Sequence, residues 1–161
     1  MNDYPSFALY RVIEQLADGS CSRVYLGESQ IDGSRRALKV FAPSVDANVQ
    51  FLNELEALLH VAHPNLITLF DFGQTLHTDQ YYLAFEYFPG QDFVTASRSV
   101  SLHQFYSMLA QVCMALDALH RRGYVHGDLK PQTCWSYPRV VASSTLRLSS
   151  YAILDTHMAR V

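Results

Sequence analysis

Alternation of apolar and polar side chains dominates the first forty residues of the chain. Residues 10–16 and 23–30 alternate as half-buried strands do, and residues 35–41 form a third segment of this kind. Asp32-Gly33, between the second and third segments, is typical of a hairpin turn. The pattern therefore predicts that the chain opens as an antiparallel meander of three strands.

A helix is expected next, over residues 46–60. Apolar side chains recur there with the 3.6-residue period of a helix. They lie on one predicted face: Phe51, Leu55, Leu58 and Leu59. Pro64 prevents the helix from continuing. The apolar runs at 66–70 and 81–87 are typical of two further strands, and a Pro-Gly pair ends the second.

The clearest helix in the sequence begins after Ser101. Ser101 and Gln104 have the spacing of a capping box, in which each side chain bonds the backbone N–H of the other. A long apolar stripe follows: Leu102, Phe105, Leu109, Val112, Leu116 and Leu119. Arg121 and Arg122 suit the last helical turn, and Gly123 suits the C′ position beyond it.

Composition indicates one globular domain with a substantial apolar core. The 161 residues are 49% hydrophobic and 17% charged. The net charge of -3 gives no indication of a nucleic-acid partner. No apolar run approaches the ~18 residues that span a bilayer, so no membrane association is expected. The three cysteines lack CxxC spacing, and a reduced, cytoplasmic protein is the simplest interpretation.

The first candidate binding segment, residues 16–25, lies between the first two predicted strands. Its Gly19 is flanked by the small residues Ala17 and Ser22. A backbone that approaches phosphate groups needs small side chains, because its N–H groups must reach the phosphate oxygens. The segment taken alone is equally typical of a plain hairpin turn.

The next candidate residues are a lysine in the third predicted strand and a glutamate in the helix that follows it. Alternation puts Lys39 on the same face of the third strand as Ala37 and Phe41. Glu54 lies one residue from Leu55, at the edge of the predicted buried face of the helix. An isolated lysine on a strand is usually a solvated charge, so the interpretation of Lys39 depends on its neighbours.

The most specific segment comes after the long helix, at residues 118–131 (ALHRRGYVHGDLKP). A long helix, a tight turn and then H-x-D-L-K-P resembles the protein kinase family, of the serine/threonine type. HPNL at 63–66 and YLAFEYFPG at 82–90 resemble the connector and the interlobe hinge of that family. The resemblance covers about residues 10–131 in the family's order.

The resemblance implies an α+β, protein-kinase-like fold and an activity. Residues 1–85 would form the N-lobe, a five-stranded antiparallel sheet with one helix. Residues 86–91 would be the hinge, and residues 92–161 the beginning of a helical C-lobe. The family transfers the γ-phosphate of ATP, with Mg²⁺, to a Ser or Thr of a protein substrate.

The resemblance also assigns roles to individual residues. Asp128 would be the catalytic base and Lys130 would contact the γ-phosphate. Lys39 would hold the nucleotide phosphates, Glu54 would pair with Lys39, and Gly19 would be the pivot of the phosphate loop. The remaining cofactor-binding residues would surround adenine, with Phe85 guarding the pocket behind it and backbone groups of the last two meeting its edge: Val24, Ala37, Phe85, Glu86 and Phe88.

The chain departs from the family at two positions near the catalytic base. Gly127 replaces the arginine that in the family meets a phosphorylated activation loop, so such control is not expected. H-G-D also occurs in the small-molecule kinases related to this family. Thr133 stands where the family has a magnesium-binding asparagine, and its hydroxyl, which can bind Mg²⁺, has a shorter reach.

The metal-binding D-F-G motif is not recognisable. After Pro131 the periodicity weakens, and residues 146–148 favour a short strand. The preferred register then puts Ser-Tyr-Ala, residues 150–152, on the three motif positions, without a carboxylate. A second register offers Asp155. Loss of the protein ligands for Mg²⁺ should lower the rate of phosphoryl transfer by orders of magnitude.

Several functions therefore remain open at this point. The substrate-binding helices of the family would follow Val161, so the stripe of the 102–121 helix is expected to be partly exposed and to favour self-association or a protein partner. The rivals to an active kinase are a pseudokinase that binds nucleotide and partners, a truncated remnant of a kinase, and a small-molecule kinase, which Gly127 favours.

Overall fold

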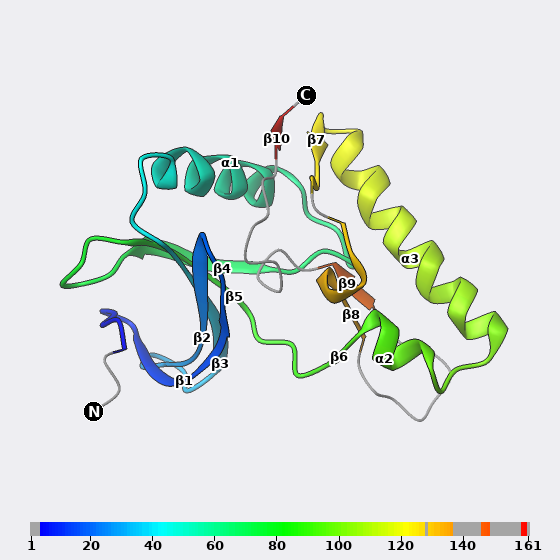
Figure 1. The fold of residues 1–161 in the computed structure, drawn as a ribbon, viewed down its shortest axis with the longest axis horizontal. Helices are drawn as coiled ribbons and strands as arrows, with labels where there is room; N and C mark the ends of the chain where they lie inside the picture. The colour runs from blue at the N-terminus through cyan, green and yellow to red at the C-terminus, as the bar shows by residue number, and fades with distance from the viewer. Residues whose placement is uncertain (1–3, 128, 137–145, 149–158, 161) are drawn as a thin grey trace.

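The computed structural model describes residues 4–127, 129–136, 146–148 and 159–160. A five-stranded antiparallel sheet of order β1-β2-β3-β5-β4 forms one part of the molecule, and helix α1 lies over one of its faces (Figure 1). The strands of the sheet are β1 (Tyr10–Asp18), β2 (Ser22–Ser29), β3 (Arg35–Phe41), β4 (Leu69–Gln74) and β5 (Tyr81–Glu86). The sheet and its opening three-stranded meander confirm the sequence-based prediction.

The strand predicted at residues 66–70 begins later than expected, at Leu69. The chain first turns after the helix: Leu66 N–H donates to the His63 carbonyl at 2.9 Å, and Asn65 N–H to His63 Nδ1 at 3.1 Å. Leu66 and Ile67 are both buried although they lie outside any strand. Their apolar character therefore reflects burial of a loop, which a run of apolar residues cannot distinguish from a strand.

Helix α1 (Ala47–His60) confirms the predicted helix within one residue. Phe51 and Leu55 are buried, as predicted, and Leu58 packs against the same core. Assigning Leu59 to this face was wrong, because its side chain is 60% exposed. At 100° per residue Leu59 lies about 80° around the helix from Phe51, which turns it away from the sheet.

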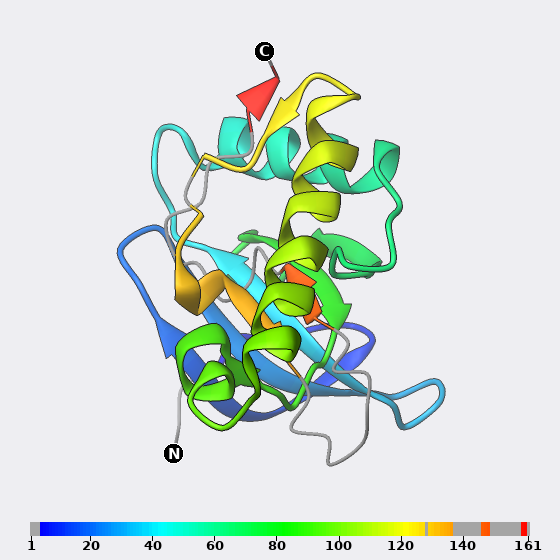
Figure 2. The same ribbon diagram turned by 90° about the vertical axis from the view of Figure 1, so that its right-hand side faces the viewer.

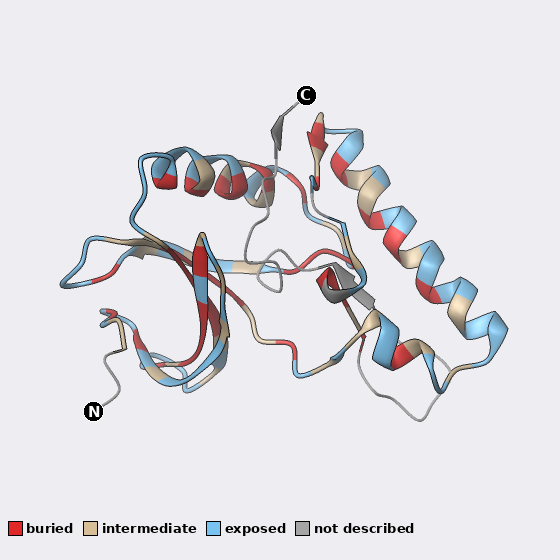
Figure 3. Ribbon diagram, in the orientation of Figure 1, coloured by how far each residue is buried: buried red, intermediate tan, exposed pale blue. Residues whose placement is uncertain are grey.

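Helix α3 (Leu102–His120) has the predicted capping box: Gln104 N–H donates to Ser101 Oγ, and Ser101 N–H to Gln104 Oε1. Its buried face differs from the predicted stripe, since Leu102 and Leu109 are exposed. Figure 3 shows buried and exposed residues alternating along α3. The buried side chains are Met108, Val112, Ala115 and Leu119. Gly123 has a φ of 77°, but it lies two residues beyond the C-cap and not at C′.

Several shorter elements join α3 in the second part of the molecule, called the helical part below. They are β6 (Gln91–Asp92), α2 (Phe93–Ser97), β7 (Tyr124–Val125), η1 (Pro131–Thr133), β8 (Cys134–Ser136), β9 (Leu146–Leu148) and β10 (Ala159–Arg160). Strands β6, β8 and β9 form one small sheet, and β7 pairs with β10. The short strand predicted at 146–148 is confirmed as β9. Figure 2 shows the end of α3 near α1. Within the described ranges, no helix is long and apolar enough to cross a bilayer.

Among the described residues, buried side chains form three groups. The inner cluster lies between the sheet and α1: Val24, Ala37, Phe41, Phe51, Leu55, Ile67, Leu83, Phe85 and Phe88. The outer cluster lies on the opposite face of the sheet: Phe7, Tyr10, Tyr25, Leu38, Val40, Tyr82 and Ala84. The third joins α3 to the end of α1, through residues that include Ala57, Val61, Leu119 and Tyr124.

The outer cluster contains two tyrosines that share one carboxylate. The hydroxyls of Tyr10 and Tyr82 each donate to Asp71 Oδ2 at 3.2 Å. Burial, and then the negative charge of Asp71, raises the pKa of Tyr10 to about 12. The same causes raise the pKa of Tyr82 above its ordinary value. Both phenols are therefore held in the protonated form.

We expect this cluster to make the protein sensitive to alkali. The folded state retains phenol protons that the unfolded state releases above its pKa of 10.0, so the free energy of unfolding should fall as pH rises through 10 toward about 12. Urea titrations across this range would measure the slope. In a Tyr10→Phe/Tyr82→Phe variant the slope should be shallower, and an unchanged slope would contradict the assignment.

Candidate functional site

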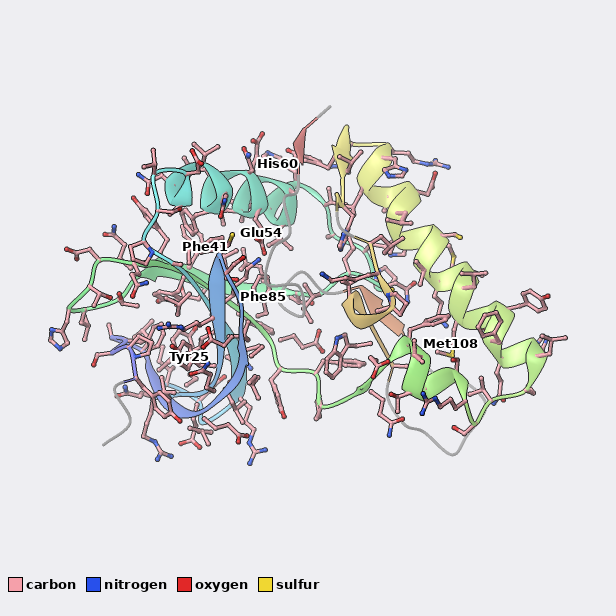
Figure 4. The ribbon with its side chains drawn as sticks, viewed as in Figure 1. Tyr25, Phe41, Glu54, His60, Phe85 and Met108 are labelled. Carbon is pink, nitrogen blue, oxygen red and sulfur yellow. The ribbon has the colours of Figure 1, made fainter. Side chains whose placement is uncertain are left out.

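A buried ion pair joins the sheet to α1. Lys39 Nζ donates to Glu54 Oε2 at 2.7 Å, and each residue is only 1% exposed. Figure 4 shows Glu54 pointing from α1 toward the sheet that carries Phe41 and Phe85. The pairing that the family resemblance implied is present, and Glu54 is fully buried where the sequence predicted only the edge of the buried face.

The register of the sheet fixes the position of Lys39. On β3 it lies opposite Val24 of β2 and Leu83 of β5, in the middle of the sheet. The predicted common face is confirmed, because Ala37 and Phe41 belong to the inner cluster. Lys39 Nζ also lies 5.2 Å from the centre of the Phe41 ring, a distance at which a cation is attracted to an aromatic face.

The contact with Lys39 compensates the buried charge of Glu54. Among the described residues, its second oxygen, Oε1, is buried and has no hydrogen-bond partner. Removing the cation from a buried carboxylate lowers the stability of the folded protein by several kcal/mol. The ion pair therefore constrains where α1 lies relative to β3.

Four of the predicted adenine-binding residues are brought together in the inner cluster: Val24, Ala37, Phe85 and Phe88. Phe85 is completely buried and lies opposite Ala37 in the sheet. Trp135, in β8, packs against the same cluster and was missed in the sequence. Burial alternates along Cys134, Trp135 and Ser136, but a strand of three residues is too short to be recognised from the sequence.

The predicted phosphate loop is a tight turn between β1 and β2, in which Gly19 N–H donates to the Ser22 carbonyl at 3.0 Å. The predicted hinge begins at Glu86, the last residue of β5. Glu86 N–H donates to the Thr68 carbonyl at 2.9 Å, and Gly90 N–H to the Phe88 carbonyl at 2.8 Å. The N–H of Glu86 is therefore already bonded within the protein.

The segment after α3 contains the remaining predicted residues. Asp128 lies outside the described residues, as do positions 150–152 and Asp155 of the two D-F-G registers. Lys130 is half-buried. The hydroxyl of the buried Thr133 donates to the Lys130 carbonyl at 2.7 Å and accepts from Lys130 N–H at 3.3 Å. This hydroxyl proton is therefore engaged by the backbone, and its role as a Mg²⁺ ligand stays a prediction.

Gly127 has a left-handed backbone conformation, with a φ of 76°. Such a conformation costs about 1–2 kcal/mol for residues that carry a Cβ. Glycine adopts it without this penalty, which gives a backbone reason for the residue that departs from the family pattern.

Comparison with known proteins identifies the family. The protein kinase domain model matches residues 10–134, and the chain belongs to the protein kinase family. The serine/threonine-protein kinase Pkn1 of Myxococcus xanthus is 31% identical over 157 residues, which are 92% of this chain and 22% of that protein. Serine/threonine-protein kinase pkn2 of the same organism is 29% identical over 158 residues, or 94% and 18% of the two chains.

A solved structure is similar over most of the chain. The crystal structure of the Mycobacterium tuberculosis PknI kinase domain matches with a TM-score of 0.72 and 25% identity, covering 92% of this chain and 61% of that one. The fold is thus that of a protein kinase domain, as predicted. The chain spans less than a quarter of the length of the curated relatives named above.

Breaking the ion pair from one side should be costly. We expect Lys39→Met to lower the free energy of unfolding by about 3–5 kcal/mol, because Glu54 is left buried and uncompensated. The double variant Lys39→Met/Glu54→Leu should recover most of this loss, since apolar side chains can replace a buried pair at little cost. Urea unfolding measures both.

The control for this experiment is Arg11→Met, which removes an exposed ion pair with Glu28 that has an N–O distance of 2.9 Å. Its effect should stay within about 0–1 kcal/mol. A Lys39→Met variant no less stable than Arg11→Met would contradict the structural importance of the buried pair.

Proposed function

We propose that this chain is the ATP-binding part of a serine/threonine protein kinase. The observation that carries the proposal is the buried pair of Lys39 and Glu54, 2.7 Å apart. Lysine is almost never fully buried unless it is paired, because removing its charge from water is costly. Its presence in the centre of the sheet of a kinase domain supports a role in holding phosphate groups.

ATP would be held by groups from three parts of the chain. The adenine ring would lie against the apolar side chains of Val24 and Ala37, and Phe85 would guard the pocket behind it. Backbone groups of Glu86 and Phe88 would meet its polar edge. The phosphates would extend toward the turn at Gly19 and the amine of Lys39. The clustering of the apolar members in one buried group supports this arrangement.

Phosphoryl transfer would use the segment after α3. Asp128 would accept the proton of the substrate hydroxyl, and Lys130 would contact the γ-phosphate. Mg²⁺, when bound, would neutralise charge on the phosphates, and Thr133 is the candidate protein ligand. We further propose the division into an N-lobe (1–85), a hinge (86–91) and the beginning of a C-lobe (92–161).

A second candidate function is that of a pseudokinase, which binds nucleotide and a protein partner without efficient transfer. The observation that favours it is the burial of Thr133, which is 0% exposed and whose hydroxyl oxygen accepts a hydrogen bond from Lys130 N–H at 3.3 Å. A hydroxyl oxygen that is buried and already accepts a hydrogen bond is less available to a metal ion than the longer asparagine of the family pattern.

We also propose that α3 forms an interface with a protein partner or with a second copy of the chain. Exposed side chains at helical spacing form the α3 stripe, which consists of Leu102, Tyr106, Leu109 and Cys113. Contiguous apolar surface of this kind is typical of interaction sites.

The three free cysteines suit a reducing compartment such as the cytoplasm.

The nucleotide site is tested by thermal unfolding of the purified chain with ATP, with and without Mg²⁺. A ligand at ~100 times its Kd adds about 2.7 kcal/mol of stability, so the melting temperature should rise and should rise further with Mg²⁺. Lys39→Ala should remove this ligand-induced rise, whereas Arg11→Ala on the protein surface should keep it.

The outcomes separate the two candidates. A rise that is indifferent to Mg²⁺ would favour the pseudokinase. No rise in a protein that unfolds cooperatively would contradict ATP binding altogether.

The proposed interface is tested by sedimentation of the chain over a range of concentrations. We expect oligomers that Leu102→Glu/Leu109→Glu converts to monomers, because charges would be buried in the interface. Ile31→Glu is the matched control, since Ile31 is an exposed side chain (77%) in the turn between β2 and β3, away from α3. A wild-type chain that remains monomeric throughout would contradict self-association.

A further inference from the structure

The C-terminal end of α1 is bonded to the segment that follows α3. The hydroxyl of Tyr124 lies 3.2 Å from Glu56 Oε1 and 3.4 Å from His60 Nδ1. Arg122 Nη1 donates to the His60 carbonyl at 2.7 Å. Figure 4 shows His60 at the end of α1 nearest to β7. These four residues, Arg122, Tyr124, Glu56 and His60, are called the α1 latch below.

The geometry settles which group donates to which. His60 Nδ1 lies 2.7 Å from the Glu56 carbonyl, so this nitrogen carries a proton and donates it there. It cannot then accept from Tyr124, whose hydroxyl proton is directed to the Glu56 carboxylate. Tyr124 is 4% exposed, and a hydroxyl so well buried requires a partner.

The latch and the ion pair hold α1 from different sides. Glu54 and Glu56 are two residues apart, or about 200° around the helix. Glu54 faces β3, whereas Glu56 faces the segment after α3. At the other end of the helix, Asp46 makes no side-chain capping bond. The orientation of α1 is therefore set by its packing on the sheet on one side and by the latch on the other.

Apolar packing supports the same connection. Ala57 and Val61, at the end of α1, share a buried cluster with Tyr124 and Leu119. The Tyr124 ring therefore remains packed if only its hydroxyl is removed, and the hydrogen bond can be tested separately from the core. Strand β7, which contains Tyr124, leads directly into the HGDLKP segment, which begins at His126.

We infer that the α1 latch is a positioning device for the nucleotide lysine. The latch bonds α1 to the segment that precedes HGDLKP. It thereby fixes the position of α1 along its axis and its rotation about that axis, so that Glu54 meets Lys39. None of its members belongs to the proposed nucleotide-binding or catalytic residues, so we describe them as positioning residues. The consequence for ATP binding rests on the proposed function, whereas the consequence for α1 does not.

The test compares two tyrosine variants that each remove one hydroxyl bonded to a carboxylate oxygen at 3.2 Å. Tyr124→Phe removes the latch bond, and Tyr82→Phe removes the bond to Asp71 on the outer face of the sheet. Hydrogen exchange of α1 amides is measured relative to β3 amides in the full chain, together with the Kd for ATP. We expect Tyr124→Phe to speed relative exchange of α1 and to weaken ATP binding, each by about 5-fold, and Tyr82→Phe to change neither.

Conservative variants at Glu56 separate a specific bond from general loss of packing. Glu56→Gln keeps a carbonyl oxygen that can accept from Tyr124, so it should behave as the wild type. Glu56→Ala should match Tyr124→Phe, and the combination of the two should add little further effect. Unchanged relative exchange of α1 in Tyr124→Phe would overturn the inference. If the wild type binds no ATP, the proposed function fails, but the exchange experiment still decides whether the latch holds α1.

Discussion

The buried ion pair between Lys39 and Glu54 is the constraint on which the candidate site depends. Both side chains are removed from water, and their atoms meet at 2.7 Å. Such a pair is favourable only when its geometry is maintained, because the desolvation cost of each charge is large. The sheet fixes one partner through strands on both sides of β3, so the position of α1 determines whether the pair forms.

Helix α1 accordingly takes part in two cores. Its Phe51 and Leu55 pack into the inner cluster against the sheet, while Ala57 and Val61 pack with Leu119 and neighbouring residues of the helical part. A displacement of α1 would disturb both. This arrangement links the lysine that would hold phosphate to the segment that would carry out the chemistry, through ordinary packing and a few hydrogen bonds.

The elements with regular periodicity were predictable from the sequence: the meander, α1 and the capped helix α3. The buried face of α3 was not, because Leu102 and Leu109 match the helical period yet lie exposed, while Met108 and Ala115 are buried. Pairing of Lys39 with Glu54 was predictable only through the family resemblance, since each residue alone is typical of a solvated charge. The Tyr124 hydroxyl contact depends on tertiary placement that no local pattern encodes.

The most direct test of the account is labelling with an acyl-phosphate derivative of ATP, which transfers its acyl group to an amine beside the bound phosphates. The chain contains two lysines, Lys39 and Lys130, so the labelled peptides are easily assigned. The account predicts acylation of Lys39 that excess ATP blocks and that urea abolishes. Acylation of Lys39 that ATP does not reduce, or its absence from the folded protein, would contradict a phosphate site at the buried pair.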